Sequence, residues 1–407
     1  MKNVDAARRV DYYVGIVLCF FGTIAKKLFS LFAVGRPVCR PKNILLIELS
    51  EMGSAVLADP AMQKLKHALN ADLFFAIFNK NSPSLELLDT IPRKNVFCMR
   101  DSGIIAAAAD ALRFFRWTRK NHIDTVIDLE LFSRFTALLT GFSGAERRVG
   151  FHAFYSEGLY RGDFLTHKVA YNPHQHIAKN FIALVNAVLS GKPEIPYSKT
   201  VVTDEETALR KITPGEQAQQ AMRRKIKSAY PPFDPGQHRV VLFNTDASTL
   251  IPLRRWPQQH YTELAQMVLE HAPRAVILLT GDASERLGKD AIVKSVNSDR
   301  CVNFAGQTTI RELPALYTLS AFMLTNDSGP AQFASVTAMP TYVLFGPESP
   351  ALYGPLGTMV PIHAGLACSP CVSAANHRKT VCNDNICLQA ITPSRVFQVL
   401  KPNLDVL

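Results

Sequence analysis

Residues 325–348 read TNDSGPAQFASVTAMPTYVLFGPE, and this stretch indicates the fold more clearly than any other. It begins where a buried strand, expected over 321–325, ends. The loop that follows holds helix-capping residue types, a glycine that permits a tight turn and a proline suited to the first helical position, namely Asn326, Asp327, Ser328, Gly329 and Pro330. The spacing therefore predicts a short helix and then a second buried strand over 341–345.

A polar loop between a strand and a helix N-terminus is a common place for an anion to bind. The first N–H groups of a helix have no partner within it, and the helix dipole places positive charge there. In an open α/β sheet the ligand crevice also lies at the carboxyl ends of the strands. The stretch fits a phosphate site, and it fits equally a βαβ corner that binds nothing.

The rest of the chain alternates between strands and helices in the same way. Buried strands are expected in one half over 43–49, 72–79, 125–129 and 147–151, and in the other half over 240–244, 275–280 and 302–304. Strands that alternate with helices indicate parallel sheets, so the fold class is α/β. We expect an N-terminal segment, a Rossmann-like domain, a linker rich in Pro, Lys, Glu and Gln, and a second Rossmann-like domain, over 1–42, 43–195, 196–238 and 239–407 respectively.

The composition is that of a basic globular protein. The chain has 407 residues, with 45 Lys and Arg against 34 Asp and Glu, which gives a net charge of +11. A basic protein can bind nucleic acid, an anionic membrane or phosphorylated substrates. No arginine-rich helix or aromatic–basic pattern is present, so a nucleic-acid partner is not expected. No cleavable signal peptide is evident, and we expect a reducing, cytoplasmic setting.

The N-terminal segment combines cations with an apolar run. Eight of the lysines and arginines lie within residues 1–42, and the run extends from Tyr12 to Ala25. It is short for a hydrocarbon core of about 30 Å, and Lys26 and Lys27 interrupt it. We expect a helix in the interface of an anionic membrane, which would make the protein peripheral or monotopic at the cytoplasmic face of the cytoplasmic membrane. The alternative is a helix docked on the protein's own core.

The opening stretch also resembles a family signature. Asn-Asp-Ser-Gly-Pro, with Phe-Gly-Pro one strand later, resembles glycosyltransferase family 9, the heptosyltransferase-type enzymes. Further pieces match in order, at Asn43–Pro60, Thr245–Ser248, Arg254–Pro257, Leu278–Glu285, Ala305–Gly306 and Arg311–Leu313. The resemblance covers about residues 43–400. It implies the GT-B fold, in which two Rossmann-like domains with parallel sheets face a central cleft, with the acceptor in the N-terminal domain and the nucleotide-sugar donor in the other.

A donor site must stabilise the diphosphate that leaves, so cations and N–H dipoles are expected to face it. Arg254 and Arg255 are the candidate cations, and Glu285 can accept hydrogen bonds from ribose hydroxyls. A diphosphate would repel Asp327, which is expected to cap its helix, shape the loop or meet sugar hydroxyls. The expected donor set is Thr245, Arg254, Arg255, Glu285, Asn326, Asp327, Ser328, Gly329, Pro330 and Gln332. The alternatives are an arginine that faces solvent and a Glu285 that only begins a helix.

Activation of an acceptor hydroxyl requires a base within reach. The family places an aspartate directly after the glycine of the first loop, whereas here Ser54 follows Gly53. A serine hydroxyl is not a general base near neutral pH, so a nearby carboxylate is expected to replace the aspartate. The candidate catalytic residues are Glu51, Ser54 and Asp59, with Glu51 preferred as the base. The candidate acceptor-binding residues are Gly53, His152 and His176.

Four cysteines near the C-terminus have the spacing C-x2-C-x10-C-x4-C, namely Cys368, Cys371, Cys382 and Cys387. Four thiolates can close a tetrahedral zinc site, so a structural zinc ion is one expectation. The alternatives are a disulfide or free thiols. No Asp-x-Asp motif lies in a suitable loop, and GT-B enzymes typically need no catalytic metal, so we expect no cofactor for catalysis.

These features predict an inverting, metal-independent glycosyltransferase. It would move a sugar, such as a heptose from an ADP-activated donor, to a glycolipid or lipopolysaccharide-type acceptor. Because Ser54 departs from the family pattern, a non-catalytic nucleotide-sugar-binding or scaffold protein is an alternative. A sugar-nucleotide epimerase of the same fold is another.

Overall fold

The computed structural model divides into two compact units. One contains Met1–Ala208 and Ala374–Arg378, and the other contains Leu209–Ser373 and Lys379–Leu407. The chain passes from the first unit to the second within the stretch expected to be a linker. The structure describes residues 2–31, 40–131, 133–155, 159–247, 251–374, 376 and 378–407.

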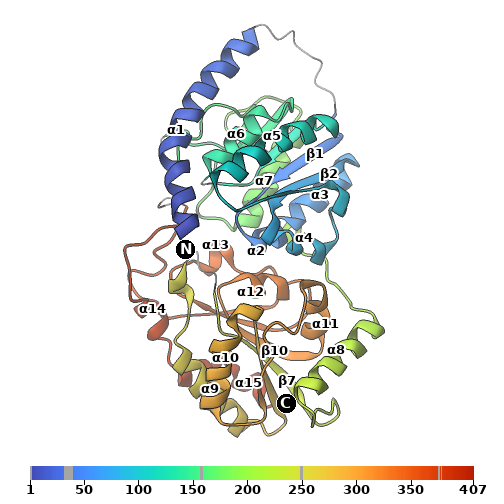
Figure 1. Ribbon diagram of the computed structural model, residues 1–407, viewed down its shortest axis with the longest axis vertical. Coiled ribbons are helices and arrows are strands. Elements are labelled where there is room, and N and C mark those ends of the chain that lie inside the picture. The colour runs from blue at the N-terminus through green and yellow to red at the C-terminus, as the bar shows by residue number, and fades with distance from the viewer. Residues whose placement is uncertain are drawn as a thin grey trace. The chain divides into compact units, whose positions relative to one another are not determined.

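Six parallel strands form the sheet of the first unit, in the order β3-β2-β1-β4-β5-β6 (Figure 1). They are β1 (Asn43–Ile47), β2 (Asp72–Phe78), β3 (Val96–Met99), β4 (Thr125–Asp128), β5 (Arg147–Phe151) and β6 (His167–Val169). The central strand β1 is buried from its second residue to its last, as its continuous apolar run predicts for a parallel sheet. The sequence analysis did not identify β3 and β6, because strands of four and three residues are too short to show a clear period.

Helices connect these strands. They are α1 (Lys2–Leu31), α2 (Met52–Leu57), α3 (Asp59–Leu69), α4 (Pro83–Leu88), α5 (Ile104–Lys120), α6 (Arg134–Phe142) and α7 (Ile177–Leu189), with single 3₁₀ turns at Asn79–Asn81, Arg93–Asn95 and Glu205–Thr207. One difference from the sequence analysis affects the site. Gly53 and Ser54, expected in a loop, lie within a helix, because α2 already begins at Met52.

The sheet of the second unit also has six parallel strands, in the order β12-β11-β10-β7-β8-β9. They are β7 (Arg239–Asn244), β8 (Ala275–Thr280), β9 (Cys301–Asn303), β10 (Ser320–Asn326), β11 (Thr341–Phe345) and β12 (Met359–His363). The edge strand β12 was not expected, since most of its residues are exposed or half-buried.

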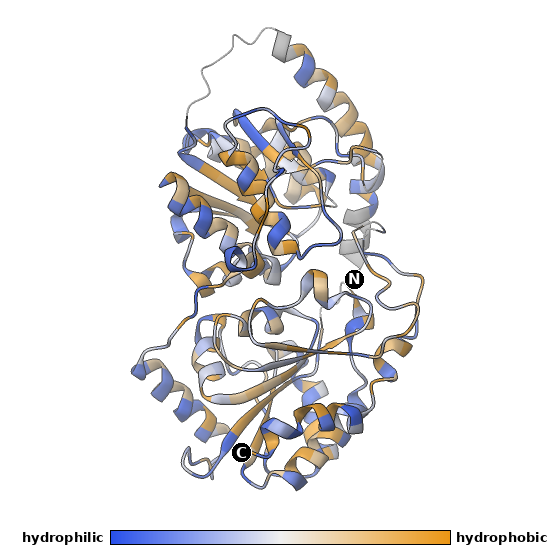
Figure 2. Ribbon diagram, turned by 180° about the vertical axis from the view of Figure 1, so that it is seen from behind, coloured by the Kyte–Doolittle hydropathy of each residue, from blue (hydrophilic) through white to orange (hydrophobic). Residues whose placement is uncertain are grey.

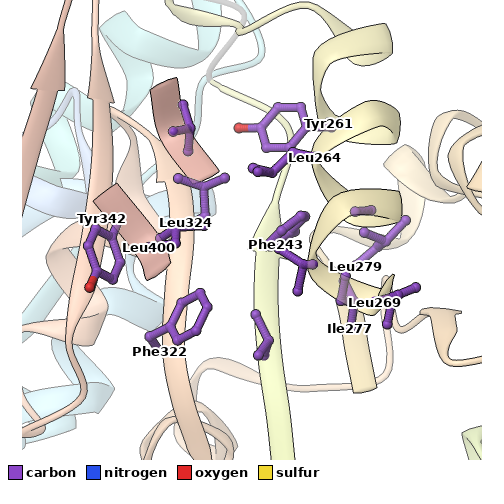
Figure 3. Close-up of a cluster of buried hydrophobic side chains, with 14 of the residues drawn as sticks. Phe243, Tyr261, Leu264, Leu269, Ile277, Leu279, Phe322, Leu324, Tyr342 and Leu400 are labelled. Atoms are coloured by element: carbon purple, nitrogen blue, oxygen red, sulfur yellow. The ribbon is translucent and has the colours of Figure 1, made fainter. Parts of the chain in front are cut away.

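The helices of the second unit are α8 (Glu216–Ala229), α9 (Gln258–His271), α10 (Arg286–Val296), α11 (Leu313–Thr318), α12 (Gly329–Ala334), α13 (Pro350–Tyr353), α14 (Ile386–Gln389) and α15 (Pro393–Leu404), with 3₁₀ turns at Pro252–Arg254, Ala283–Glu285 and Ile310–Glu312. A hydrophobic core joins β7, β8 and β10 to the helices α9 and α15. Figure 3 shows Phe243, Tyr261 and Leu324 within it. This core holds the loops at the carboxyl ends of β7 and β10 in place.

The first helix, α1, packs on α6 (Figure 1). Asp11 accepts hydrogen bonds from the backbone N–H groups of Arg134 at 3.1 Å and Phe135 at 2.9 Å, and so caps the start of α6. The part of α1 with described side chains therefore docks on its own unit, which was the second of the two alternatives. Within the described part of the chain, no helix combines the length and the apolar character that crossing a membrane requires.

Candidate functional site

Each sheet has a switch point, at which neighbouring strands connect in opposite directions along the sheet. These points lie between β1 and β4 in the first unit and between β7 and β10 in the second. Ligands of open parallel sheets bind outside the carboxyl ends of the strands at such points. The loops after β7 and β10 carry most of the expected donor residues, and the loops after β1 and β4 carry buried carboxylates.

Asn326, the last residue of β10, ties together the loops that follow β7 and β10. Its side-chain oxygen accepts a hydrogen bond from the backbone N–H of Trp256 at 2.9 Å. Its Nδ2 donates to the carbonyl oxygens of Thr245 at 3.0 Å and Asp246 at 3.3 Å. Asn326 is 0% exposed, so its amide holds the loops through buried hydrogen bonds and does not itself reach the surface. Trp256 is also buried and belongs to the core.

Arg254 is the buried cation of the expected donor site. Its Nη1 lies 3.6 Å from Oδ2 of Asp327, and both side chains are less than a tenth exposed. Its Nε is buried and has no hydrogen-bond acceptor among the described residues. A buried donor left without an acceptor costs about 1–3 kcal/mol, so this guanidinium is suited to receive an anionic ligand.

Asp327 forms an ion pair with Arg254. The N-cap residue of α12 is Ser328, and the Ser328 side chain makes no capping hydrogen bond. The roles expected of Asp327, in capping the helix, shaping the loop or meeting sugar hydroxyls, stay predictions. Its carboxylate lies beside a cation, which would reduce the repulsion that it exerts on a phosphate.

Lys289 forms a second buried charge cluster beside the loop after β7. Its Nζ lies 2.7 Å from Asp246 Oδ2 and 3.0 Å from Glu285 Oε2, and its side chain is 0% exposed. The Glu285 carboxylate also accepts a hydrogen bond from the backbone N–H of Asp282. A Cβ at Gly281 would lie 2.1 Å from Glu285 Oε2, so the charged ends of this cluster would have to shift to accommodate any other residue. Glu285 thus both begins a helix and remains partly exposed.

The other expected donor residues lie around the same loops. Arg255 is more exposed than Arg254, and it donates to the carbonyl oxygen of Ala247 at 3.0 Å. Ser328 donates to the carbonyl oxygen of Asn326 at 3.2 Å. Gln332 donates to the carbonyl oxygen of Tyr353 at 2.8 Å, and its own side-chain oxygen is buried without a donor among the described residues. Three remaining members lie on the loop after β7 or at the start of α12, namely Thr245, Gly329 and Pro330.

Three carboxylates are buried at the switch point of the first unit, namely Glu48, Asp128 and Glu130. Glu130 Oε1 accepts hydrogen bonds from the backbone N–H groups of Leu49 and Ser50 and from the Ser50 hydroxyl, at 3.0, 3.1 and 2.6 Å. It thereby shapes the first loop. Asp128 pairs with Arg161.

Glu48 has the most strongly perturbed environment of these carboxylates. Burial, and then the neighbouring charges of Glu130, Glu51 and Asp128, raise the pKa of Glu48 well above its ordinary value. Burial also raises the pKa of Glu130, against the hydrogen bond from Ser50. Carboxyls with raised pKa values at the carboxyl edge of a sheet are typical of sites that exchange protons.

The candidate catalytic residues lie in different environments. Glu51, at the N-cap of α2, is half-buried and forms an ion pair with Arg378. Ser54 and Gly53 lie within α2 and are also half-buried. Asp59 is 1% exposed and accepts a hydrogen bond from the Thr90 hydroxyl at 2.5 Å, which is the environment of a structural carboxylate. Glu51 is therefore the more accessible of the two candidate carboxylates.

The two candidate histidines follow strands β5 and β6. The ring of His152 makes an edge contact with Phe154 at 5.0 Å between centroids. His176 is the N-cap of α7, where its Nδ1 accepts a hydrogen bond from the backbone N–H of Ala178 at 3.2 Å. That capping bond leaves the proton of a neutral His176 ring on Nε2.

The cysteine cluster is not a metal site. Among the described side chains, no group of three or more His, Cys, Asp or Glu could hold a metal ion. The expected zinc site is therefore wrong. The four cysteines differ in environment, since Cys368 and Cys382 are exposed while Cys387 is buried.

The family follows from a direct match. Residues 111–381, more than half of the chain, match the model of glycosyltransferase family 9 (heptosyltransferase). The chain belongs to glycosyltransferase family 9. Among family relatives, lipopolysaccharide heptosyltransferase 2 of Salmonella typhimurium is 32% identical over 108 residues, which is 26% of this chain and 30% of the relative. Lipooligosaccharide heptosyltransferase 2 of Haemophilus influenzae is 28% identical over 178 residues, 43% of this chain and 47% of the relative. Each alignment spans less than half of the relative.

Solved structures show the fold of this family 9 member. E. coli ADP-heptose lps heptosyltransferase II has a TM-score of 0.67 at 19% identity, covering 89% of this chain and 98% of that chain. An E. coli heptosyltransferase solved with ADP has a TM-score of 0.59 at 15% identity, covering 89% of this chain and 99% of that chain. The predicted GT-B class, with two Rossmann-like α/β units, is confirmed.

Sequence reasoning missed several members of the two sites. Glu48 directly follows an apolar strand, and that position was a signal that it lies at the carboxyl edge of the sheet. Lys289 lies four residues after Glu285, a spacing that predicts a pair on one helix face, but nothing in the sequence predicted its complete burial.

Proposed function

We propose that the protein is an inverting glycosyltransferase that needs no metal ion. It transfers a sugar, such as heptose from an ADP-activated donor, to a lipopolysaccharide-type acceptor. Membership of family 9 supports the reaction class. The similar proteins include an ADP-heptose lps heptosyltransferase and lipopolysaccharide heptosyltransferases, which supports this choice of donor and acceptor.

Arg254 is the observation that carries the donor assignment. A buried guanidinium with an unused N–H group lies at the switch point of the second sheet, where a diphosphate is expected. Negative charge develops on that diphosphate as the glycosidic bond breaks, and a preorganised cation stabilises it. In this proposal, Glu285 and the loop over residues 326–330 orient the rest of the nucleotide sugar.

Glu51 is the proposed general base for the acceptor hydroxyl, and Arg378 holds its carboxylate in position. Replacing Glu51 with glutamine should lower the transfer rate by about 10²–10⁴-fold, the usual contribution of such a base. Asp59→Asn should change the rate less, because Asp59 is bonded to Thr90. If both variants transfer sugar at the wild-type rate, the base lies elsewhere.

The alternative is a protein of this family that binds the nucleotide sugar without transfer. It is favoured by one observation, the serine at position 54 where the family has an aspartate. Donor binding by calorimetry, together with the absence of transfer to membrane extracts, would support this alternative over the enzyme.

The donor assignment is tested by thermal shift with ADP, UDP, GDP and CDP. We expect ADP to stabilise the wild-type protein most, and Arg254→Ala to weaken ADP binding about tenfold to a hundredfold, as loss of a charge-assisted hydrogen bond predicts. Arg223→Ala, an exposed arginine on α8, is the matched control and should bind as the wild type does. If no nucleotide shifts the melting temperature, the donor site is wrongly assigned.

A peripheral location at the cytoplasmic face of the membrane completes the proposal. A lipid-linked acceptor would be reached at that surface, and α1 supplies an apolar helix with neighbouring cations.

A further inference from the structure

The helix α1 has the reverse of the side-chain distribution expected for a helix on a soluble protein. Small and polar side chains face its own unit at a spacing of about one turn, namely Asp11, Gly15, Cys19, Thr23 and Lys26. Large apolar side chains face outward instead. Val17 is 51% exposed and Phe21 is 61% exposed. The other exposed apolar side chains of this helix are Tyr12, Tyr13, Val14, Ile16, Leu18, Phe20, Ile24 and Leu28. Figure 2 shows this run of hydrophobic residues along α1.

The inner contacts of α1 are specific, so its orientation on the unit is determined. A Cβ at Gly15 would lie 2.9 Å from the side chain of Arg134, which shows how closely the two helices approach. Thr23 accepts a hydrogen bond from the backbone N–H of Asp163 at 2.9 Å. Rotation of the helix to bury its apolar side chains would break these contacts. The apolar face is therefore held outward by the fold.

A basic cavity of about 660 Å³ lies beside the C-terminal half of α1, and Lys26, Lys27, Arg148 and Lys168 line it. Lys27 and Lys168 share the carboxylate of Asp163, at 3.2 and 2.7 Å. Lys26 and Arg148 donate instead to backbone carbonyl oxygens, and neither has a carboxylate partner among the described residues. Burial, and then the charge of Arg148, lower the pKa of Lys26 to about 8. Two half-buried cations without a counter-ion form a site for an anion.

We propose that α1 lies flat on an anionic phospholipid bilayer, with its outer apolar face in the acyl boundary and a lipid phosphate in the cavity between Lys26 and Arg148. The apolar face, the cations and the tyrosines of this surface each match one layer of the membrane. An interfacial helix buries its apolar face by about 5–10 Å, and nearby cations pair with anionic headgroups. Tyr12 and Tyr13 supply the aromatic rings that favour the headgroup level. The inference rests on the proposed membrane location, not on the proposed chemistry.

Vesicle flotation of the full-length protein tests the proposal. We expect binding to vesicles of phosphatidylglycerol and phosphatidylethanolamine, and weaker binding to phosphatidylcholine alone. Val17→Glu should weaken binding to both kinds of vesicle about tenfold to a hundredfold, because it places a charge in the outer face that enters the acyl boundary of the bilayer. Lys26→Gln should weaken binding to the anionic vesicles about fivefold and leave binding to phosphatidylcholine unchanged.

Matched controls keep the test independent of folding and of the donor site. Leu112→Glu replaces a leucine on α5 that is 60% exposed, and Lys120→Gln removes an exposed lysine from the same helix. Both should float as the wild type does. The ADP thermal shift is measured on every variant. A variant that loses vesicle binding but keeps this shift is still folded and still binds ADP, so its defect lies in the membrane-binding surface.

Three results would overturn the proposal. The first is that the wild-type protein binds neither vesicle type. Leu112→Glu could reduce binding as much as Val17→Glu does. Sedimentation without lipid could reveal a dimer that Val17→Glu dissociates, which would show that a second copy of the chain covers this face. Loss of the ADP shift with vesicle binding intact would instead refute only the proposed function.

Discussion

A single carboxyl group, that of Glu48, shows how position determines chemistry. It directly follows β1, where the chain leaves the sheet, and it is 5% exposed. Burial and three neighbouring carboxylates favour its neutral form, and burial is the larger cause. A raised pKa in the folded state makes stability depend on pH, with full stability below the ordinary value of 4.5 and a loss as the pH rises through the folded value.

Glu48→Gln should therefore stabilise the protein at pH 8 and have little effect at pH 4. The neutral amide removes the cost of ionising a buried carboxyl. We expect a melting temperature about 2–4 °C higher at pH 8, the shift that about 1 kcal/mol gives in a domain of this size. Differential scanning calorimetry at both pH values measures it, with exposed Glu146→Gln as the control. A lower melting temperature at pH 8 would show that Glu48 is stabilising as a carboxylate.

Gly281 is a second residue at which an added side chain would disturb a buried charge cluster. Gly281→Ala would place a methyl group 2.1 Å from Glu285 Oε2 and 2.7 Å from Lys289 Nζ, and so displace a buried ion pair. We expect a loss of about 1–3 kcal/mol in the free energy of unfolding, measured in urea. Gly288→Ala on α10 is the control, since no atom lies within 4 Å of its added methyl group, and helix propensity predicts slight stabilisation. Equal effects of the two substitutions would contradict this account.

At the scale of elements, the donor loops depend on the end of β10. Asn326 is the junction at which the loop after β7, the turn before α9 and the strand meet. Asn326 is thereby joined to two pieces of chain that lie 70 to 81 residues earlier in the sequence. The buried amide of Asn326 thus determines the shape of these loops, and with it the positions of the expected donor residues on them.

Asn326→Ala should cost about 1–3 kcal/mol of unfolding free energy, because it leaves a buried backbone N–H and two carbonyl oxygens without their partner. It should also weaken ADP binding, although Asn326 itself is buried. Urea denaturation and calorimetry with ADP measure the two effects. Asn303→Ala, at the edge strand β9, removes a half-exposed amide and should leave ADP binding unchanged. If Asn326→Ala binds ADP as tightly as the wild type does, ADP binding does not depend on the loop shape that Asn326 maintains.

For the whole molecule, the main fact is that each unit has its own sheet and its own buried residues. Leu46 lies in the centre of the first sheet and Leu324 in the centre of the second, and both are 0% exposed. A domain with its own core can open independently.

Leu324→Ala should destabilise the second unit by about 2–5 kcal/mol through the cavity that it leaves. Hydrogen exchange measured by mass spectrometry should then rise in β7, β8 and β10 while β1 and β4 stay protected. Leu46→Ala is the reciprocal control and should give the opposite pattern. Faster exchange throughout the chain in either variant would show that the two units unfold together.

The sequence alone determined the α/β class, the central strands and the family. Apolar runs such as 44–47 and 275–280 reveal buried parallel strands, because both of their faces are covered. Capping residues and the Asn326–Pro330 motif mark where loops meet helices. The strands β3 and β6 were not predicted because four and three residues are too few to show a period, and β12 was not predicted because most of its residues are exposed or half-buried.

Only the tertiary structure decided which polar groups share a site. The burial of Lys289, the pairing of Arg254 with Asp327, and the meeting of Glu48 with Glu130 all join residues from different strands or loops. It also decided that the four cysteines do not converge on a metal and that α1 keeps its apolar face outward. The physical reason is common to these cases. Local sequence sets the period of burial along one element, whereas burial and charge at a site depend on neighbours that strand order brings together.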